Sequence, residues 1–96
     1  MDMDLLKLIR EIVFAHIDSK RYHVFIFGSR AKGAAAKFSD IDVGVEGDSQ
    51  VSTLVFTELE EAFENSDLPF TVDVVDFTLV SDKFKQIAKQ HLISLN

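Results

Sequence analysis

Apolar residues recur at intervals of three and four positions in three stretches of this chain, which is the spacing of an amphipathic helix. The first stretch covers residues 4 to about 19, and the second covers residues 50–65, where glutamates occupy many of the remaining positions. The third follows Ser81, whose hydroxyl suits an N-cap, and continues to about residue 95. The pattern predicts a helix over each stretch, and residues 47–49 are expected to cap the second.

Three other stretches are short and rich in apolar and β-branched residues, as strands are. They cover residues 22–27, 40–46 and 70–77, and the first is almost continuously hydrophobic, which indicates burial on both faces. A short helix over residues 30 to about 36 is expected between the first two strands, which we expect to pair as a wide hairpin. The pattern predicts an α/β fold of the two-layer α+β kind: one domain over residues 1–96, with a mixed sheet of about three strands flanked by helices.

Composition narrows the classes of protein further. The chain has 96 residues, of which 47% are hydrophobic, and no cysteine, so a packed core is possible without disulfides or thiol chemistry. It lacks a signal-peptide pattern and any apolar run near the roughly 20 residues of a membrane span, so a cytoplasmic protein without membrane contact is expected. The net charge of −6 argues against direct nucleic-acid binding. Positive charge at Arg30, Lys32 and Lys37 is a local exception.

Two aspartates open the second expected strand. Side chains alternate between the faces of a strand, so Asp40 and Asp42 project from one face while Ile41 points into the core. Two carboxylates this close repel each other, which favours a bound cation or a shared proton. Hard divalent cations prefer oxygen ligands, and magnesium suits phosphate substrates. An ordinary exposed strand with acids facing outward is the alternative explanation.

A glycine and a serine stand where the first strand hands over to the short expected helix. Gly28 lets the backbone approach a ligand closely, and the unpaired N–H groups of a helix N-terminus favour phosphate. Ser29 adds a hydroxyl donor, and Arg30 and Lys32 add positive charge. Together with the paired aspartates, this turn indicates a metal-assisted site for a nucleoside triphosphate.

The pattern Gly28-Ser29, ten residues, then Asp40-x-Asp42 resembles the signature of the DNA polymerase β nucleotidyltransferase superfamily. In so short a chain it is most similar to the minimal nucleotidyltransferase (MNT) family, and Ser39 also fits that pattern. The resemblance implies a polymerase β-like core that uses a nucleoside triphosphate, with ATP as the expected donor, and two Mg²⁺ ions. It implies that Asp40 and Asp42 bind metal and act in catalysis. A nucleotide-binding role is implied for the positions around them: Gly28, Ser29, Arg30, Lys32 and Ser39.

Members of the superfamily take a third acid from the strand beside the paired aspartates. Asp73 and Asp76 are the candidates, and because they are three residues apart, a regular strand points them to opposite faces. We favour Asp73 as the third catalytic and metal-binding acid, because the family's acid usually opens an apolar run such as Asp-Val-Val. Asp76 is then a strand-end or capping residue.

The resemblance also implies a partner. Small MNT proteins are commonly found with a helical HEPN protein, as toxin–antitoxin pairs in which the MNT member transfers AMP to its partner. The leading hypothesis is therefore a magnesium-dependent protein adenylyltransferase that acts on a hydroxyl of a HEPN protein, within a homo- or hetero-oligomer. The alternative is a non-catalytic antitoxin that neutralises a HEPN RNase by binding alone. Transfer to a small molecule is a weaker third hypothesis, because the chain has no room for an additional acceptor-binding domain.

Overall fold

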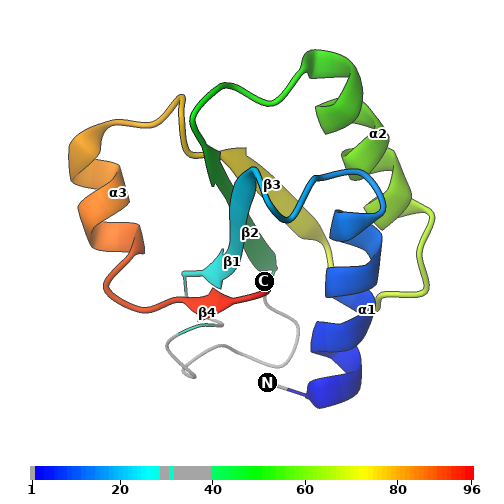
Figure 1. Cartoon of the computed structure of the whole chain (residues 1–96). Helices are drawn as coiled ribbons and strands as arrows, with labels where there is room; N and C mark the ends of the chain where they lie inside the picture. Colours follow the sequence, from blue (N-terminus) through cyan, green and yellow to red (C-terminus); the bar gives the residue numbers. More distant parts are fainter. Residues whose placement is uncertain (1, 29–30, 32–39) are drawn as a thin grey trace.

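A computed structural model of the chain describes residues 2–28, 31 and 40–96 (Figure 1). Helices and strands alternate irregularly along it. The elements, in chain order, are α1 (Met3–Phe14), β1 (Tyr22–Phe27), β2 (Ile41–Gly47), α2 (Thr53–Glu64), β3 (Val72–Asp76), α3 (Asp82–Ala88) and β4 (Ile93–Ser94). The expected α/β class is confirmed.

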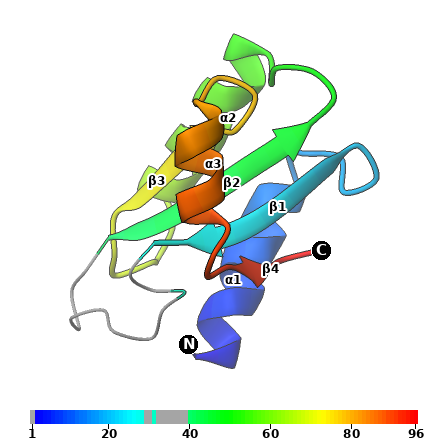
Figure 2. The same ribbon diagram turned by 90° about the vertical axis from the view of Figure 1, so that its left-hand side faces the viewer.

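The strands form one mixed sheet in the order β3-β2-β1-β4. β2 runs antiparallel to β1, as expected for a wide hairpin, and parallel to β3, while β4 pairs antiparallel with β1. Helices α1 and α2 cover one face of the sheet and the short α3 lies on the other (Figures 1 and 2). The expected helical layer is thus present on one face, and α3 adds a partial layer on the opposite face.

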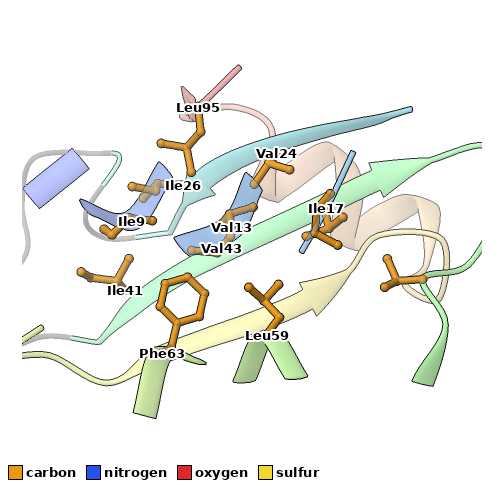
Figure 3. Close-up of a cluster of buried hydrophobic side chains, with 12 residues drawn as sticks. Ile9, Val13, Ile17, Val24, Ile26, Ile41, Val43, Leu59, Phe63 and Leu95 are labelled. Atoms are coloured by element: carbon orange, nitrogen blue, oxygen red, sulfur yellow. The ribbon is translucent and has the colours of Figure 1, made fainter. Parts of the chain in front are cut away.

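The main core lies between the sheet and the pair α1 and α2 (Figure 3). Each helix contributes residues from one stripe, such as Ile9 and Val13 of α1 and Leu59 of α2, and all three are fully buried. The alternate residues of β1 and β2 meet them from the sheet: Val24, Ile26, Ile41, Val43 and Val45. Strand alternation thus fixes which side chains of β2 are left for the opposite face.

A smaller aromatic core lies on the other face, under α3. Phe25, Phe27 and Phe77 are buried there, and the Phe77 ring meets the other two edge-on at centroid distances of 4.9 and 5.1 Å. Gly44 of β2 leaves room for these rings, because a Cβ at this position would lie 2.5 Å from Phe25 and 2.8 Å from Phe77. Most of the phenylalanines on this face are therefore core residues, as expected.

Side-chain caps explain where the helices begin. Asp2 accepts from the backbone N–H of Asp4 and Leu5 at the start of α1, and Ser81 accepts from Phe84 N at 3.1 Å at the start of α3. The cap of α2 is Ser52, whose hydroxyl accepts from Val55 N. The expectation that residues 47–49 would provide that cap is wrong, because residues 48 and 49 form a bend and the helix starts only at Thr53.

Two expected helices end early. α1 stops at its C-cap Ala15 rather than near residue 19, although Ile17 is still buried beyond it. α3 stops at its C-cap Lys89, and the residues expected to continue it form a fourth strand instead. Leu92 packs with the aromatic core while Leu95 packs into the main core on the opposite face of the sheet, and one continuous helix cannot reach both.

Strand boundaries differ from expectation by one or two residues. β2 begins at Ile41, so Asp40 immediately precedes it, and β3 is confined to Val72–Asp76 within the expected range of 70–77. The helix expected over residues 30 to about 36 lies outside the described residues, apart from Ala31 in a turn. Among the helices of the described part, none is long and apolar enough to cross a membrane.

Candidate active site

The acids expected to act together meet at one end of the sheet. Asp42 pairs in register with Phe27 of β1 on one side and with Asp73 of β3 on the other. In-register neighbours on adjacent strands project from the same face, about 4.8 Å apart along the hydrogen-bonding direction. Asp40 lies two residues before Asp42, just outside the strand. The structure therefore brings Asp40, Asp42 and Asp73 to one end of the face that also carries α3.

The charge of Asp42 is unfavourable in this arrangement. Partial burial, followed by the neighbouring Asp73 and Asp40 carboxylates, raises the pKa of Asp42 above its usual value. Each cause acts against the ionised form, burial by removing water and the two acids by repulsion. Among the described residues, no ion pair involves any of the three acids. The cluster thus lacks a compensating cation from the part of the chain that the structure describes.

Gly28 lies directly against the Asp42 carboxylate. Its φ is +77°, a left-handed conformation that glycine adopts without strain, and a Cβ built there would lie 2.5 Å from Asp42 Oδ2. The end of β1 therefore turns sharply at the acids, and only a residue without a side chain fits. The other residues expected to bind nucleotide lie outside the described residues: Ser29, Arg30, Lys32 and Ser39.

Asp73 and Asp76 differ in their surroundings. Asp73 is exposed, whereas Asp76 is only 6% exposed and has both carboxylate oxygens occupied. One oxygen accepts from Val51 N at 2.9 Å, and the other accepts from the backbone N–H and the hydroxyl of Thr78 at 2.9 and 2.7 Å. Asp76 thus ties the end of β3 to the segment before α2. This is the structural role expected for it, and it leaves Asp73 as the acid beside Asp42.

The donor set has the chemistry that Mg²⁺ prefers, since three carboxylates gather on one face with no described cation among them. In the described part, no group of three His, Cys, Asp or Glu side chains is arranged to hold one ion. Asp40 and Asp73 are exposed, so both can rotate towards Asp42 at little cost. The residues present therefore fit a hard divalent cation by type and position, once these side chains converge.

Two hollows adjoin residues of the site. One, of about 380 Å³, is bounded by Asp73 and by residues around the start of β3, including Phe70, Thr71 and Val72. The other, of about 210 Å³, adjoins Gly28 and runs under α3. No motif or residue pattern indicated the second hollow directly. The one available signal was the spacing of apolar residues in α3, which fits an ordinary buried stripe equally well.

Comparison with known proteins agrees with this geometry. The model of a family described as "Nucleotidyltransferase domain" matches residues 6–95. The chain is 41% identical over 69 residues to a Haemophilus influenzae protein named "Probable protein adenylyltransferase MntA", a match that covers 72% of this chain. It spans 60% of the length of that relative.

Two solved structures have the same fold. One is described as a "putative minimal nucleotidyltransferase" and is 28% identical, with a TM-score of 0.71, covering 97% of this chain and 95% of that one. The other, described as a toxin–antitoxin with AMP-PNP, is 25% identical with a TM-score of 0.76, covering 95% of this chain and 72% of that one. The mixed sheet and the helices of the described residues therefore form a nucleotidyltransferase core fold.

Proposed function

Because this chain belongs to the nucleotidyltransferase-domain family, we propose that it transfers a nucleoside monophosphate, AMP from ATP, to a hydroxyl of a HEPN partner protein. We propose further that residues 1–96 act as a single minimal nucleotidyltransferase domain and serve as the antitoxin of a toxin–antitoxin pair. The observation that carries the proposal is the adjacency of Asp42 and Asp73 beside Gly28, in a cluster that raises the pKa of Asp42.

Phosphate binding is assigned to the turn after β1. The left-handed Gly28 leaves its backbone open to close approach, and Ser29, Arg30, Lys32 and Ser39 are proposed to complete the contacts to the triphosphate. Such contacts hold the α-phosphorus near the acids. Positioning of this kind contributes much of the catalysis in phosphoryl and nucleotidyl transfer, because little covalent chemistry is left to the protein.

The acids are assigned to metal binding and proton transfer. Asp40, Asp42 and Asp73 are proposed to hold two Mg²⁺ ions, which when bound neutralise phosphate charge and favour an ionised acceptor hydroxyl. Asp73, exposed at the edge strand, accepts the proton of that hydroxyl as its oxygen attacks the α-phosphorus. The new bond joins the acceptor oxygen to phosphorus. The bond to the bridging oxygen breaks, and pyrophosphate leaves.

The partner is proposed from two kinds of support. The Haemophilus influenzae relative is named as an adenylyltransferase of proteins, and the similar AMP-PNP structure is a toxin–antitoxin. The resemblance to MNT proteins adds the HEPN class of partner. A protein acceptor also fits the shallow surroundings of the acids, because Asp40 and Asp73 are exposed to an approaching surface.

Label transfer from ATP labelled at the α-phosphate, with Mg²⁺ and a HEPN protein encoded beside this chain, tests the proposal. Label is expected on the partner with the wild-type protein and not with Asp42→Asn. Asp48→Asn is the matched control, because Asp48 is an exposed aspartate just beyond the other end of β2. Its transfer should equal that of the wild type.

A non-catalytic antitoxin is the second candidate function. This function predicts that Asp42→Asn still binds and neutralises the partner fully. It also predicts that the wild-type protein transfers label to the partner from none of the four nucleotides. That pair of results would contradict the transferase assignment. Loss of transfer in both Asp42→Asn and Asp48→Asn would instead point to a general effect of charge on partner binding.

A further inference from the structure

An apolar hollow opens beside Gly28, between the end of β1 and α3. Its volume is about 210 Å³, and its described lining consists of Phe27, Gly28, Phe84, Ile87, Ala88 and His91. In Figure 2, α3 lies in front of the sheet, where it crosses β2. Phe27 belongs to the aromatic core under α3 and pairs in register with Asp42, so the hollow lies on the same face as the acids.

The wall formed by α3 is held in place although none of its residues is buried. The Phe84 ring meets Phe27 and Phe77 at centroid distances of 6.1 and 5.7 Å. Lys85 and Lys89 both form ion pairs with Glu46 of β2, and Lys89 also donates a hydrogen bond to it. α3 is therefore fastened to the sheet at several points along its length.

The same helix leaves apolar surface uncovered. Phe84 is 40% exposed and Ile87 is 57% exposed, and both line the hollow. Exposed apolar residues that line a concave surface next to polar groups are typical of small-molecule sites. His91 is the one polar side chain among the described lining residues.

The hollow and the acids are neighbours on one face of the sheet. Phe27 lines the hollow and pairs with Asp42, which in turn pairs with Asp73. The backbone of one lining residue, Phe27, is thus about one strand spacing, roughly 5 Å, from that of Asp42. Gly28 connects the hollow with the acids, because it lines the hollow and lies against the Asp42 carboxylate. A ligand with its phosphates at Gly28 can place its other end in the hollow.

Resting on the nucleotidyltransferase function proposed above, we propose that this hollow binds the purine base of the nucleoside triphosphate. The base stacks on Phe84 and packs against Ile87, with the His91 ring at the rim. Stacking and apolar contact supply the affinity, since every base has a face that can stack. An apolar pocket discriminates poorly between molecules of similar size, so ATP and GTP bind similarly and the smaller pyrimidine nucleotides bind more weakly.

Equilibrium binding without the partner tests this inference separately from catalysis. Calorimetry with Mg²⁺ would compare ATP, GTP, CTP and UTP analogues, each with a methylene group in place of the α–β bridging oxygen, with inorganic tripolyphosphate. The wild-type protein should bind the ATP analogue at least about 10-fold more tightly than tripolyphosphate, within the 5- to 150-fold range of base stacking.

Two variants probe the wall of the hollow. Phe84→Ala should weaken binding of the ATP analogue about 10-fold and leave tripolyphosphate unchanged. Ile87→Gln should act in the same direction, and because Ile87 is more than half exposed, this variant keeps the fold if Phe84→Ala loosens α3. Leu79→Gln is the matched control, because Leu79 is 65% exposed and does not line this hollow. It should bind both ligands as the wild type does.

The outcomes separate the two proposals. Equal affinity of the wild type for the ATP analogue and tripolyphosphate would overturn the base site while leaving the nucleotidyltransferase function intact. Unchanged binding in folded Ile87→Gln would overturn it too. A preference for pyrimidine analogues would do the same. Failure of every analogue and of tripolyphosphate to bind would overturn the proposed function, and the base site with it.

Discussion

Replacing each of the two β3 aspartates with asparagine should show that Asp76 stabilises the fold and that Asp73 does not. Asp76→Asn and Asp73→Asn make the same chemical change three positions apart on one strand. Asp76 is buried and accepts three hydrogen bonds, whereas Asp73 is exposed beside another carboxylate. The same substitution is therefore expected to lower stability clearly at Asp76 and to change it little at Asp73.

The magnitude for Asp76→Asn comes from counting donors and acceptors. The asparagine oxygen can keep both bonds from Thr78, but its NH₂ group then faces the Val51 N–H, donor against donor. Val51 is 4% exposed, so water cannot easily replace the lost acceptor. Two buried donors, the Val51 N–H and the asparagine NH₂, are then unsatisfied, and each costs about 1–3 kcal/mol, so the free energy of unfolding should fall by about 2–6 kcal/mol.

Thermal unfolding followed by circular dichroism measures the difference in stability between each variant and the wild type. For a domain of this size about 1 kcal/mol corresponds to roughly 4–8 °C, so Asp76→Asn should lower Tm by at least about 8 °C. Asp73→Asn should stay within about 0.5 kcal/mol of the wild type, as exposed substitutions usually do. Equal losses in the two variants, or a larger loss in Asp73→Asn, would refute the assignment of Asp76 to structure and Asp73 to the site.

Four further predictions concern the acids and two of the glycines, Gly28 and Gly44. Asp42→Asn should raise Tm at pH 7, because the raised pKa of Asp42 in the folded state means that the ionised carboxylate destabilises the fold. This gain in Tm should vanish below about pH 4, where the wild-type carboxyl group is protonated in both the folded and the unfolded state. A gain that persists at low pH would contradict the electrostatic explanation. Mg²⁺ at ten times its Kd should stabilise the wild type by about 1.4 kcal/mol, reversed by EDTA, and should leave Asp42→Asn unchanged in the same melts. Gly28→Ala should cost about 1–2 kcal/mol for its left-handed backbone and more for the contact with Asp42, and the double variant with Asp42→Ala should recover the second part. Gly44→Ala should cost about 1–3 kcal/mol through overpacking against Phe25 and Phe77, with Mg²⁺ binding retained in the folded fraction.

Local patterns were sufficient to predict only part of how the acids meet. Alternation along residues 40–46 placed Asp42 opposite the core-facing Ile41, which needs only the two-residue period of a strand and the rule that a buried face fixes register. The choice of Asp73 as the neighbouring acid rested on the resemblance to the superfamily, whose third acid comes from the adjacent strand and usually opens an apolar run. The parallel pairing of β2 and β3 then brings the two carboxylates together without further requirement.

The C-terminal segment could not be predicted in the same way. Phe84, Ala88, Leu92 and Leu95 are spaced as one helical stripe, yet Leu95 lies in the core on the opposite face from the other three. Periodicity reports that residues share a face, but not that the chain crosses the sheet edge between them. β4 forms because Ser94 and Ile93 find unpaired partners on β1, a long-range contact that no local pattern carries.

Three alternate residues of β2, Asp42, Gly44 and Glu46, have different roles on the face that carries α3. Gly44 makes room for aromatic rings, Glu46 fastens α3 through two lysines, and Asp42 carries a charge that its surroundings disfavour. The residues between them, Ile41, Val43 and Val45, are buried and fix the register of β2. Burial of these three side chains offsets the cost of the charge on Asp42. A slip of one residue would bury Asp42 in the main core. The hydrophobic face of β2 therefore holds the acids together, and a divalent cation between them would remove the repulsion that the folded chain otherwise retains.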